Sequence, residues 1–267
     1  MAAEETAEGS APVQGELWGT RARDWAELQE PQHRPLYDEG IRLTGIGPET
    51  SVLDVGCGCG LFCRLAADAG ASVSGIDASA PSIEIAKERV PEGDFQVGDL
   101  QFLPHADDRF DVVTGFNSFQ FAADPRAALA EARRVAKPGA PVFLLVWGRE
   151  ERTELVAMLE ALRPLLPPAP PGAVGPFALS HGDALEELAT AAGLTPGEGG
   201  YLEVTFEYPD EETIVRAALS SGGGARAIAE AGEDAAQQAL TECLSPFRRA
   251  NGAYRLETEW RYLLGSA

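Results

Sequence analysis

Lysine is nearly absent from this chain, which has only Lys87 and Lys137 among its 267 residues. Its 42 Asp and Glu residues outnumber its 21 Lys and Arg residues, and the formal net charge is −21. A surface of this charge repels the phosphates of nucleic acids and the anionic heads of lipids. We therefore expect neither a nucleic acid nor a membrane as a partner.

Long apolar runs and cysteine are also scarce. No segment approaches the roughly 20 consecutive apolar residues that cross a bilayer, and four cysteines are too few for a disulfide framework in a chain of this length. Residues 1–15 are acidic and rich in Ala and Gly, without the basic and apolar regions of a signal peptide, and predict a disordered tail. These features favour a cytoplasmic protein.

Short apolar segments alternate with amphipathic ones between residues 48 and 148. Helical segments follow Gly60, Ser79 and Asp124, and the strand-like segments are SVLDV, ASVSGI, DFQV, FDVVTGF and PVFLLVW. Strands that alternate with helices form a parallel sheet with helices on both faces. The sequence therefore predicts an α/β fold in which a doubly wound, Rossmann-like core spans residues 48–148.

The segments on either side of this core are expected to complete and cover it. Residues 16–47 have helical periodicity with Trp18 and Trp25 on one face, and breaks at Pro31 and Pro35 predict two lid helices. Residues 149–267 add two strand-like segments, which gives a seven-stranded sheet. Inserts at about 151–195 and 210–250 are expected to form a helical cap over the pocket.

The segment VLDVGCGCG, residues 52–60, carries the strongest functional signal. It predicts a buried strand ending at Asp54 and a tight glycine turn before a helix, which is where open α/β sheets bind nucleotides. The next two strands end at Asp77 and Asp99. The first carboxylate can accept both hydroxyls of a ribose, and the second can accept from an exocyclic amine such as adenine N6. Such an acidic rim suits a cationic adenosine ligand without phosphates.

These motifs, in this order, resemble those of the class I S-adenosylmethionine-dependent methyltransferases. VLDVGCGCG is similar to the family's glycine-rich motif, GIDAS to its ribose-binding strand, GDLQFLPHADDRFDVV to its adenine loop and fourth strand, and RVAKPGAPVFLLVW to the entry of its fifth strand. The chain most resembles the small-molecule enzymes of ubiquinone and menaquinone biosynthesis and of bacterial secondary metabolism. The resemblance implies that the last strand is antiparallel.

The same resemblance implies that the cofactor is S-adenosylmethionine. Asp54 and Gly56 would hold its methionine end, Asp77 its ribose and Asp99 its adenine. The residues implied in cofactor binding are Asp54, Gly56, Cys57, Gly58, Gly60, Asp77, Ala78, Asp99, Leu100 and Asn117. The residues expected at the acceptor are Trp18, Trp25, Phe116, Ser118 and Phe119, although the two tryptophans could equally anchor the lid in the core.

The implied reaction is an in-line displacement of the sulfonium methyl group by an O, N or C atom of a small, largely apolar metabolite. Positioning of the reactants and the exclusion of water supply most of the rate of such a displacement. A base is needed only where the nucleophile keeps its proton at neutral pH. The candidates are His33 at the corner of the lid helices, His181 at the head of a cap helix, and Gln120.

Other interpretations use the same residues. A protein that binds S-adenosylmethionine without transferring methyl, such as a cyclisation catalyst or an accessory subunit, would share every cofactor motif. A nicotinamide-dependent dehydrogenase is disfavoured, because Leu61 stands where the last glycine of G-x-G-x-x-G belongs. Cys57, Cys59 and Cys63 could suggest a metal site, but no histidine is near them, and small buried thiols are the preferred interpretation.

Overall fold

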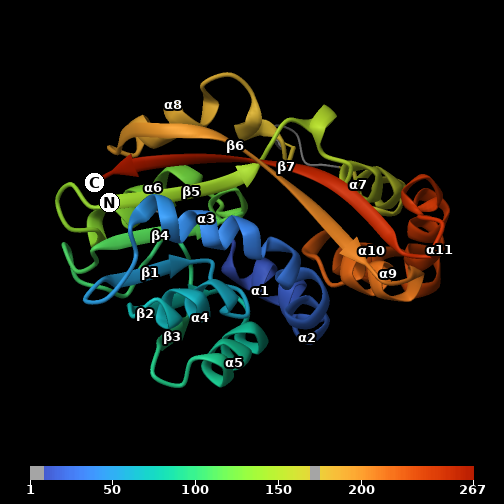
Figure 1. Cartoon of the computed structure of the whole chain (residues 1–267), viewed down its shortest axis with the longest axis horizontal. Coiled ribbons are helices and arrows are strands. Elements are labelled where there is room, and N and C mark those ends of the chain that lie inside the picture. Colours follow the sequence, from blue (N-terminus) through green and yellow to red (C-terminus); the bar gives the residue numbers. More distant parts are fainter. Residues whose placement is uncertain (1–8, 169–174) are drawn as a thin grey trace, which may run out of the picture.

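The computed structural model describes residues 9–168 and 175–267, and its centre is a seven-stranded sheet (Figure 1). The strand order is β3-β2-β1-β4-β5-β7-β6, with parallel pairing from β3 to β5 and with β7 antiparallel to both of its neighbours. The predicted α/β fold and antiparallel last strand are confirmed. The strands are β1 (Ser51–Val55), β2 (Ser72–Asp77), β3 (Asp94–Val97), β4 (Val112–Phe116), β5 (Pro141–Trp147), β6 (Thr195–Tyr208) and β7 (Tyr254–Ser266).

Helices cover both faces of this sheet. The helices are α1 (Ala11–Gly19), α2 (Ala22–Asp24), α3 (Arg34–Thr44), α4 (Leu61–Asp68), α5 (Ala80–Arg89), α6 (Pro125–Val135), α7 (Val156–Leu162), α8 (Ala184–Ala191), α9 (Glu211–Leu219), α10 (Gly222–Ala231) and α11 (Glu233–Cys243). Short π or 3₁₀ turns are η1 (Trp25–Gln29), η2 (Glu30–His33), η3 (Phe119–Phe121), η4 (Glu150–Arg152), η5 (Arg163–Leu165), η6 (Ala178–Ser180) and η7 (Ser245–Phe247).

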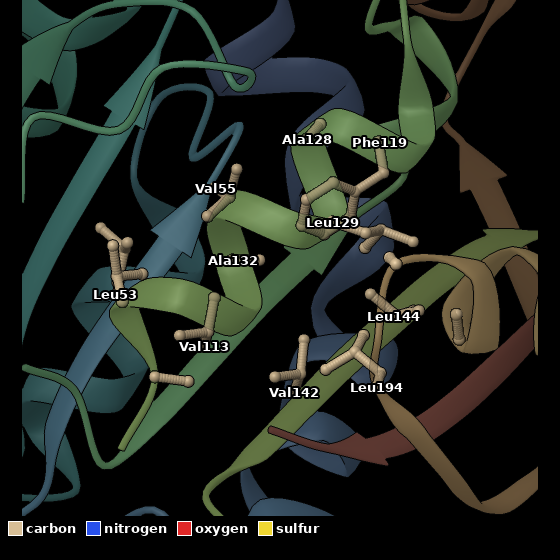
Figure 2. Close-up of a cluster of buried hydrophobic side chains, with 14 of the residues drawn as sticks. Leu53, Val55, Val113, Phe119, Ala128, Leu129, Ala132, Val142, Leu144 and Leu194 are labelled. Carbon is tan, nitrogen blue, oxygen red and sulfur yellow. The ribbon is translucent and has the colours of Figure 1, made fainter. Parts of the chain in front are cut away.

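Successive apolar residues of the central strands point to opposite faces of the sheet. Leu53 and Leu144 are buried against α6 and α8 on one face (Figure 2). Val52 lies with the α3, α4 and α5 side chains on the other face, where Phe143 packs on α3. Strands buried on both faces are apolar at nearly every position, which explains the runs SVLDV and PVFLLVW, in which the buried Asp54 is the exception.

Two helices begin at the caps that the sequence predicts. The Ser79 hydroxyl accepts the backbone N–H of Ser82 at 3.2 Å, and α5 starts there. Asp124 Oδ1 accepts the N–H groups of Arg126 and Ala127 at 2.9 and 3.1 Å, with Pro125 as the first residue of α6. These bonds satisfy donors that a helix start leaves open.

The helical cap lies at the ends of two long strands, β6 and β7 (Figure 1). β6 and β7 have 14 and 13 residues and extend beyond the parallel strands to α7 and α9–α11 (Figure 1). The prediction that all of 151–195 belongs to the cap is wrong, because Leu185 and Ala189 of α8 are buried in the core of the sheet with α6. Only the first part of that insert, with α7, joins the cap.

The first helix begins at Ala11, nearer the N-terminus than residue 16, where the sequence predicts the lid helices to begin. Residues 1–8 of the predicted tail lie outside the described residues, but the disordered tail is wrong for residues 11–15, since α1 begins at Ala11. Pro12 is tolerated there because the first turn needs no N–H at that position. Among the described residues, no helix is long and apolar enough to cross a membrane.

Candidate functional site

The glycine turn after β1 has the backbone conformation that only glycine adopts readily. Gly56, Gly58 and Gly60 have φ angles of +79°, +52° and +79°. A Cβ atom at Gly56 would lie 2.3 Å from the Cβ of Ser118, and one at Gly60 would lie 2.8 Å from that of Ala86. Two of the glycines are therefore also required by close packing. Gly58 lines a cavity, and a Cβ atom there would lie 3.7 Å from Glu30 Oε1 and 3.8 Å from Trp25 Nε1, at ordinary contact distance.

Asp77 lies at the end of β2 beside this turn. Its Oδ2 atom accepts the N–H of Gly58 at 2.9 Å, and its Oδ1 atom accepts the N–H of Ser79 at 2.8 Å. Burial raises the pKa of this carboxyl, and the two hydrogen bonds oppose the rise. Each oxygen keeps a second lone pair, so that the carboxylate can still accept two hydroxyl groups.

Asp99 lies at the next strand end and contacts the N-terminal helix. Its Oδ1 atom accepts the N–H of Gln101 at 2.8 Å, and its Oδ2 atom accepts the N–H of Ala11 at 3.0 Å. Further along α1, a Cβ atom at Gly15 would lie 2.3 Å from the carbonyl oxygen of Ala78. The lid thus packs directly on the two loops that carry the acidic residues.

A first cavity opens between α1, the glycine turn and these acids. It holds about 850 Å³ of empty space, part of which is open solvent. Twelve residues of the predicted site line it: Trp18, Trp25, His33, Gly56, Gly58, Asp77, Ala78, Asp99, Leu100, Phe116, Asn117 and Ser118. The residues that sequence reasoning missed are Ser10, Ala11, Gln14, Tyr37, Ser82, Phe121 and Leu145.

Three of the predicted cofactor residues lie behind the cavity wall. Asp54 is 2% exposed and accepts the Thr114 hydroxyl at 2.7 Å, and Cys57 and Gly60 are also buried. Burial raises the pKa of Asp54 to about 7, and the neighbouring Asp77 adds to the rise. Cys57 and Gly60 belong to the glycine turn and Asp54 precedes it, so these residues shape the turn without lining the cavity.

Two predictions beyond β4 are corrected by the short η3 turn. Phe119 does not face the acceptor, because it packs in the core beside Leu129 (Figure 2), and Phe121 lines the cavity in its place. Gln120 lines neither this cavity nor the one described below. Its amide donates to Asn117 Oδ1, so it holds that side chain.

His181 is also placed away from the site. It is exposed at the start of the loop before α8 and lines neither cavity. The prediction assumed that α8 is a cap helix, whereas α8 packs on the sheet. His33 is the remaining histidine candidate.

A second cavity of about 550 Å³ continues from the first toward the cap. Four residues line both cavities: Trp18, Trp25, His33 and Asn117. The other residues that line the second cavity are Gln29, Trp147, Leu155, Met158, Leu159, Leu162, Ala217, Ala218, Ser221 and Trp260. The chain has four tryptophans, and all of them line this cavity. Among residues 9–168 and 175–267, no Lys, Arg, Asp or Glu lines it.

Asn117, at the junction of the two cavities, has a left-handed backbone. Its φ angle is +54°, which is uncommon outside glycine but is accessible to asparagine. The N–H of Asn117 donates to the Leu145 carbonyl at 2.7 Å, so the main chain of β5 holds this conformation. Non-glycine residues with such backbone angles concentrate at functional sites.

His33 lies at the same junction in an aromatic surround. Its ring centroid lies 5.7 Å from that of Trp25 and 5.2 Å from that of Trp260. Its Nδ1 atom lies 3.1 Å from the Gln29 carbonyl oxygen, which can only accept, so Nδ1 carries the proton and Nε2 has a free lone pair. Burial lowers the pKa of His33 to about 4, so the imidazole is neutral at pH 7.

A π turn and a 3₁₀ turn in the lid bring further polar residues to the site that the sequence analysis missed. Glu30 is 2% exposed, accepts the N–H of Leu61 at 3.2 Å and pairs with Arg89. The lid is thereby tied to the first turn of α4, directly after the glycine turn. Gln29 lies one residue earlier, on the second cavity. π turns occur often at functional sites.

Three comparisons with known proteins bear on this site. Residues 53–144 match a family described as "Methyltransferase domain". The uncharacterised protein Rv1405c of Mycobacterium tuberculosis is 33% identical over 183 residues, which cover 64% of this chain and 66% of that protein. A demethylmenaquinone methyltransferase of Renibacterium salmoninarum is 42% identical over 99 residues, 37% of this chain and 42% of that protein. The structure of the [4+2]-cyclase SpnF is similar with a TM-score of 0.54 and 18% identity, over 94% of this chain and 92% of that one.

Residues 53–144 therefore match the methyltransferase family that the motifs predict, and the chain spans 66% and 42% of the lengths of these two curated relatives. The methyl donor of this family is S-adenosylmethionine, so the family and the cofactor predicted from the motifs are confirmed. The likeness to SpnF concerns the fold alone.

Proposed function

We propose that the protein transfers the methyl group of S-adenosylmethionine to a small, uncharged, largely apolar acceptor. The observation that carries this proposal is the shared wall of the two cavities at Trp18, Trp25, His33 and Asn117. One cavity has an acidic rim, and the other has an apolar lining. A donor in the first and an acceptor in the second would meet at this wall.

The residues of the first cavity suit the donor. Asp77 would accept the ribose hydroxyls, and Asp99 would accept the adenine amino group, with the Leu100 N–H available to the ring. The bound cofactor supplies an electrophilic methyl group on a sulfonium. The Trp18, Trp25 and Phe116 side chains exclude water from the reacting end, and this exclusion and the fixed orientation are the main sources of rate for such a displacement.

His33 is the candidate general base. Its Nε2 lone pair can accept the proton of an acceptor hydroxyl as the new bond forms. The imidazole is neutral at pH 7 because its pKa is about 4, so no prior deprotonation is required.

An S-adenosylmethionine-binding protein that transfers no methyl group, such as a cyclisation catalyst, stays the alternative. A cytoplasmic location likewise stays a prediction from composition. Release of S-adenosylhomocysteine from S-adenosylmethionine in the presence of hydroxylated aromatic acceptors tests the proposal. We expect product that requires both the acceptor and Asp77. Tight cofactor binding without any turnover over a broad acceptor panel would favour the alternative.

A further inference from the structure

Gln29 is a polar residue in an otherwise apolar part of the second cavity. It is 8% exposed and lines the cavity with Leu155, Met158 and Leu159. Its Oε1 atom accepts the hydroxyl of the buried Tyr208 at 2.7 Å. Its Nε2 amino group has no hydrogen-bond acceptor among residues 9–168 and 175–267.

The contact with Tyr208 fixes the orientation of this amide. Burial raises the pKa of Tyr208 well above its ordinary value, so the phenol keeps its proton and is a donor. Its hydroxyl has no other acceptor among the described residues, so Oε1 of Gln29 must face it. The Nε2 hydrogens are then directed away from Tyr208 and are free for a ligand.

The backbone around Gln29 is held in place as well. Gln32, one turn later, donates to the Glu207 carbonyl oxygen at 2.8 Å and accepts the Glu207 N–H at 3.1 Å. These two bonds and the Tyr208 contact tie the lid to the end of β6. Gln29 is therefore preorganised, and an ordered donor costs a ligand little to use.

A second unpartnered donor belongs to the same wall. The indole N–H of Trp260 is buried and has no acceptor among the described residues, and Trp260 lines the cavity. A buried donor without a partner is costly, so the Trp260 N–H requires an explanation. The Gln29 amino group is not fully buried and borders the cavity. An oxygen atom of a ligand would satisfy a donor on this wall, whereas a hydrocarbon would not.

We propose that Gln29 is a specificity-determining residue that donates a hydrogen bond to a carbonyl oxygen of the acceptor. The acceptor class is a planar, uncharged, hydroxylated aromatic ketone: the hydroxyl faces Nε2 of His33, the carbonyl oxygen faces Nε2 of Gln29, and the ring lies among the tryptophans. This inference rests on the proposed function for the placement of the acceptor, but it concerns binding and is tested without turnover.

The test compares matched ligand pairs. Each isomer of hydroxyacetophenone is paired with the ethylphenol of the same substitution, which has a methylene in place of the carbonyl. Both are titrated into the full chain saturated with S-adenosylhomocysteine, by calorimetry and by tryptophan emission corrected for ligand absorbance. Because all four tryptophans line the second cavity, their emission reports ligand binding there.

Two variants test how much the side-chain amide of Gln29 contributes to ligand affinity. Gln29→Met with Tyr208→Phe removes both hydrogen-bonding partners and leaves no orphaned hydroxyl. Gln29→Met alone is the second variant if the pair folds poorly. Gln237→Met is the matched control, because Gln237 is an exposed glutamine on α11 that lines neither cavity.

We expect at least one isomer to bind the unmodified chain about 10-fold or more tightly than its ethylphenol. This preference should vanish in the Gln29 variants and persist in Gln237→Met. Equal affinity within every pair, or a preference that survives Gln29→Met, would overturn the inference. A preference that depends on Gln29 together with no methyl transfer would instead leave the inference standing and contradict the proposed function.

Discussion

Ala11 donates its backbone N–H to Oδ2 of Asp99 at 3.0 Å. The first turn of α1 therefore contacts the carboxylate that we propose binds the adenine amino group. A carboxylate oxygen accepts more than one hydrogen bond, so the contact leaves room for a ligand donor. Ser10, Ala11, Gln14 and Trp18 line the first cavity from one face of this helix. The helix therefore closes the adenosyl side of the site.

Gly15→Ala should weaken cofactor binding. The added Cβ atom would lie 2.3 Å from the Ala78 carbonyl oxygen, so α1 must move off the loop that follows Asp77. We expect the Kd for S-adenosylhomocysteine to rise about 10-fold, mainly through faster dissociation, although alanine is the better helix former by about 1 kcal/mol. Stopped-flow and calorimetric binding measure the effect.

Gly223→Ala is the control for that prediction. It is the same substitution in the first turn of α10, where the nearest atom to the new Cβ is Ser221 Oγ at 3.9 Å. It should leave the cofactor Kd unchanged. Identical dissociation rates for the two variants would show that α1 does not close the cofactor site.

Asp77→Asn should reduce cofactor affinity while the fold is retained. The amide keeps one oxygen for a backbone N–H but loses the charge-assisted acceptance of ribose hydroxyls, which is worth about 1.5–3 kcal/mol per bond. We expect the Kd to rise about 10²-fold in calorimetry, with a cooperative melting transition that is lowered by a few degrees because the N–H of Gly58 or Ser79 loses its acceptor. Unchanged affinity would remove Asp77 from the ribose site.

Asp54→Asn should change the pH dependence of stability. The folded chain holds a proton on Asp54 up to about pH 7, whereas the unfolded chain releases it near 3.8. This contribution is fully present below pH 3.8 and is lost as the pH rises through 7, so an ionised Asp54 costs up to roughly 4 kcal/mol. Thr114 can still donate to the asparagine oxygen.

Urea unfolding at pH 5 and pH 8 measures this effect. The variant should gain stability relative to the unmodified chain on going from pH 5 to pH 8. The same difference between the two proteins at both values would mean that Asp54 is ionised throughout, in conflict with its burial.

His33→Phe should separate methyl transfer from cofactor binding. Phenylalanine keeps the packing against Trp25 and Trp260 but removes the Nε2 lone pair. For a hydroxyl acceptor we expect kcat to fall about 10²–10⁴-fold, the range for a general base, with the cofactor Kd unchanged. An unaltered kcat would show that His33 only packs.

The same variant should lose a sensitivity to mild acid. The unfolded chain takes up a proton on His33 near pH 6.5, whereas the folded chain does so only near pH 4. Stability is therefore lost as the pH falls from 6.5 to 4, by roughly 3 kcal/mol. Denaturation over this pH range should show a smaller loss for His33→Phe than for the unmodified chain.

The sheet and the acidic rim could be predicted from the sequence because both follow from local patterns. The apolar runs show where the strands lie, and parallel strands bring their carboxyl ends to one edge, so Asp77 and Asp99 had to lie near the glycine turn. The alternation of Val52 and Leu53 between the two faces likewise follows from the two-residue period of a strand.

The lid residues could not be predicted because they depend on irregular backbone. Gln29 lies four residues after Trp25, on the face that a regular helix also presents, but Leu28 is the apolar residue there and the sequence pattern favours it for burial. The η1 turn places Gln29 and not Leu28 on the cavity wall. Glu30 is recognisable only through Arg89, its partner 59 positions away.

The misplaced residues have similar causes. Phe119 and Phe121 are both aromatic, and only the η3 turn decides which of them is buried in the core. His181 precedes a helix whose apolar face suits either the cap or the sheet, and that choice depends on packing against α6.

A structure of the full chain with bound S-adenosylhomocysteine would locate the methyl donor. We expect its ribose on Asp77, its adenine beside Asp99 and Leu100, and its sulfur at the junction formed by Trp18, Trp25, His33 and Asn117, facing the tryptophan-lined cavity. A ligand whose sulfur faces away from that cavity, or which lies outside the first cavity altogether, would contradict this placement.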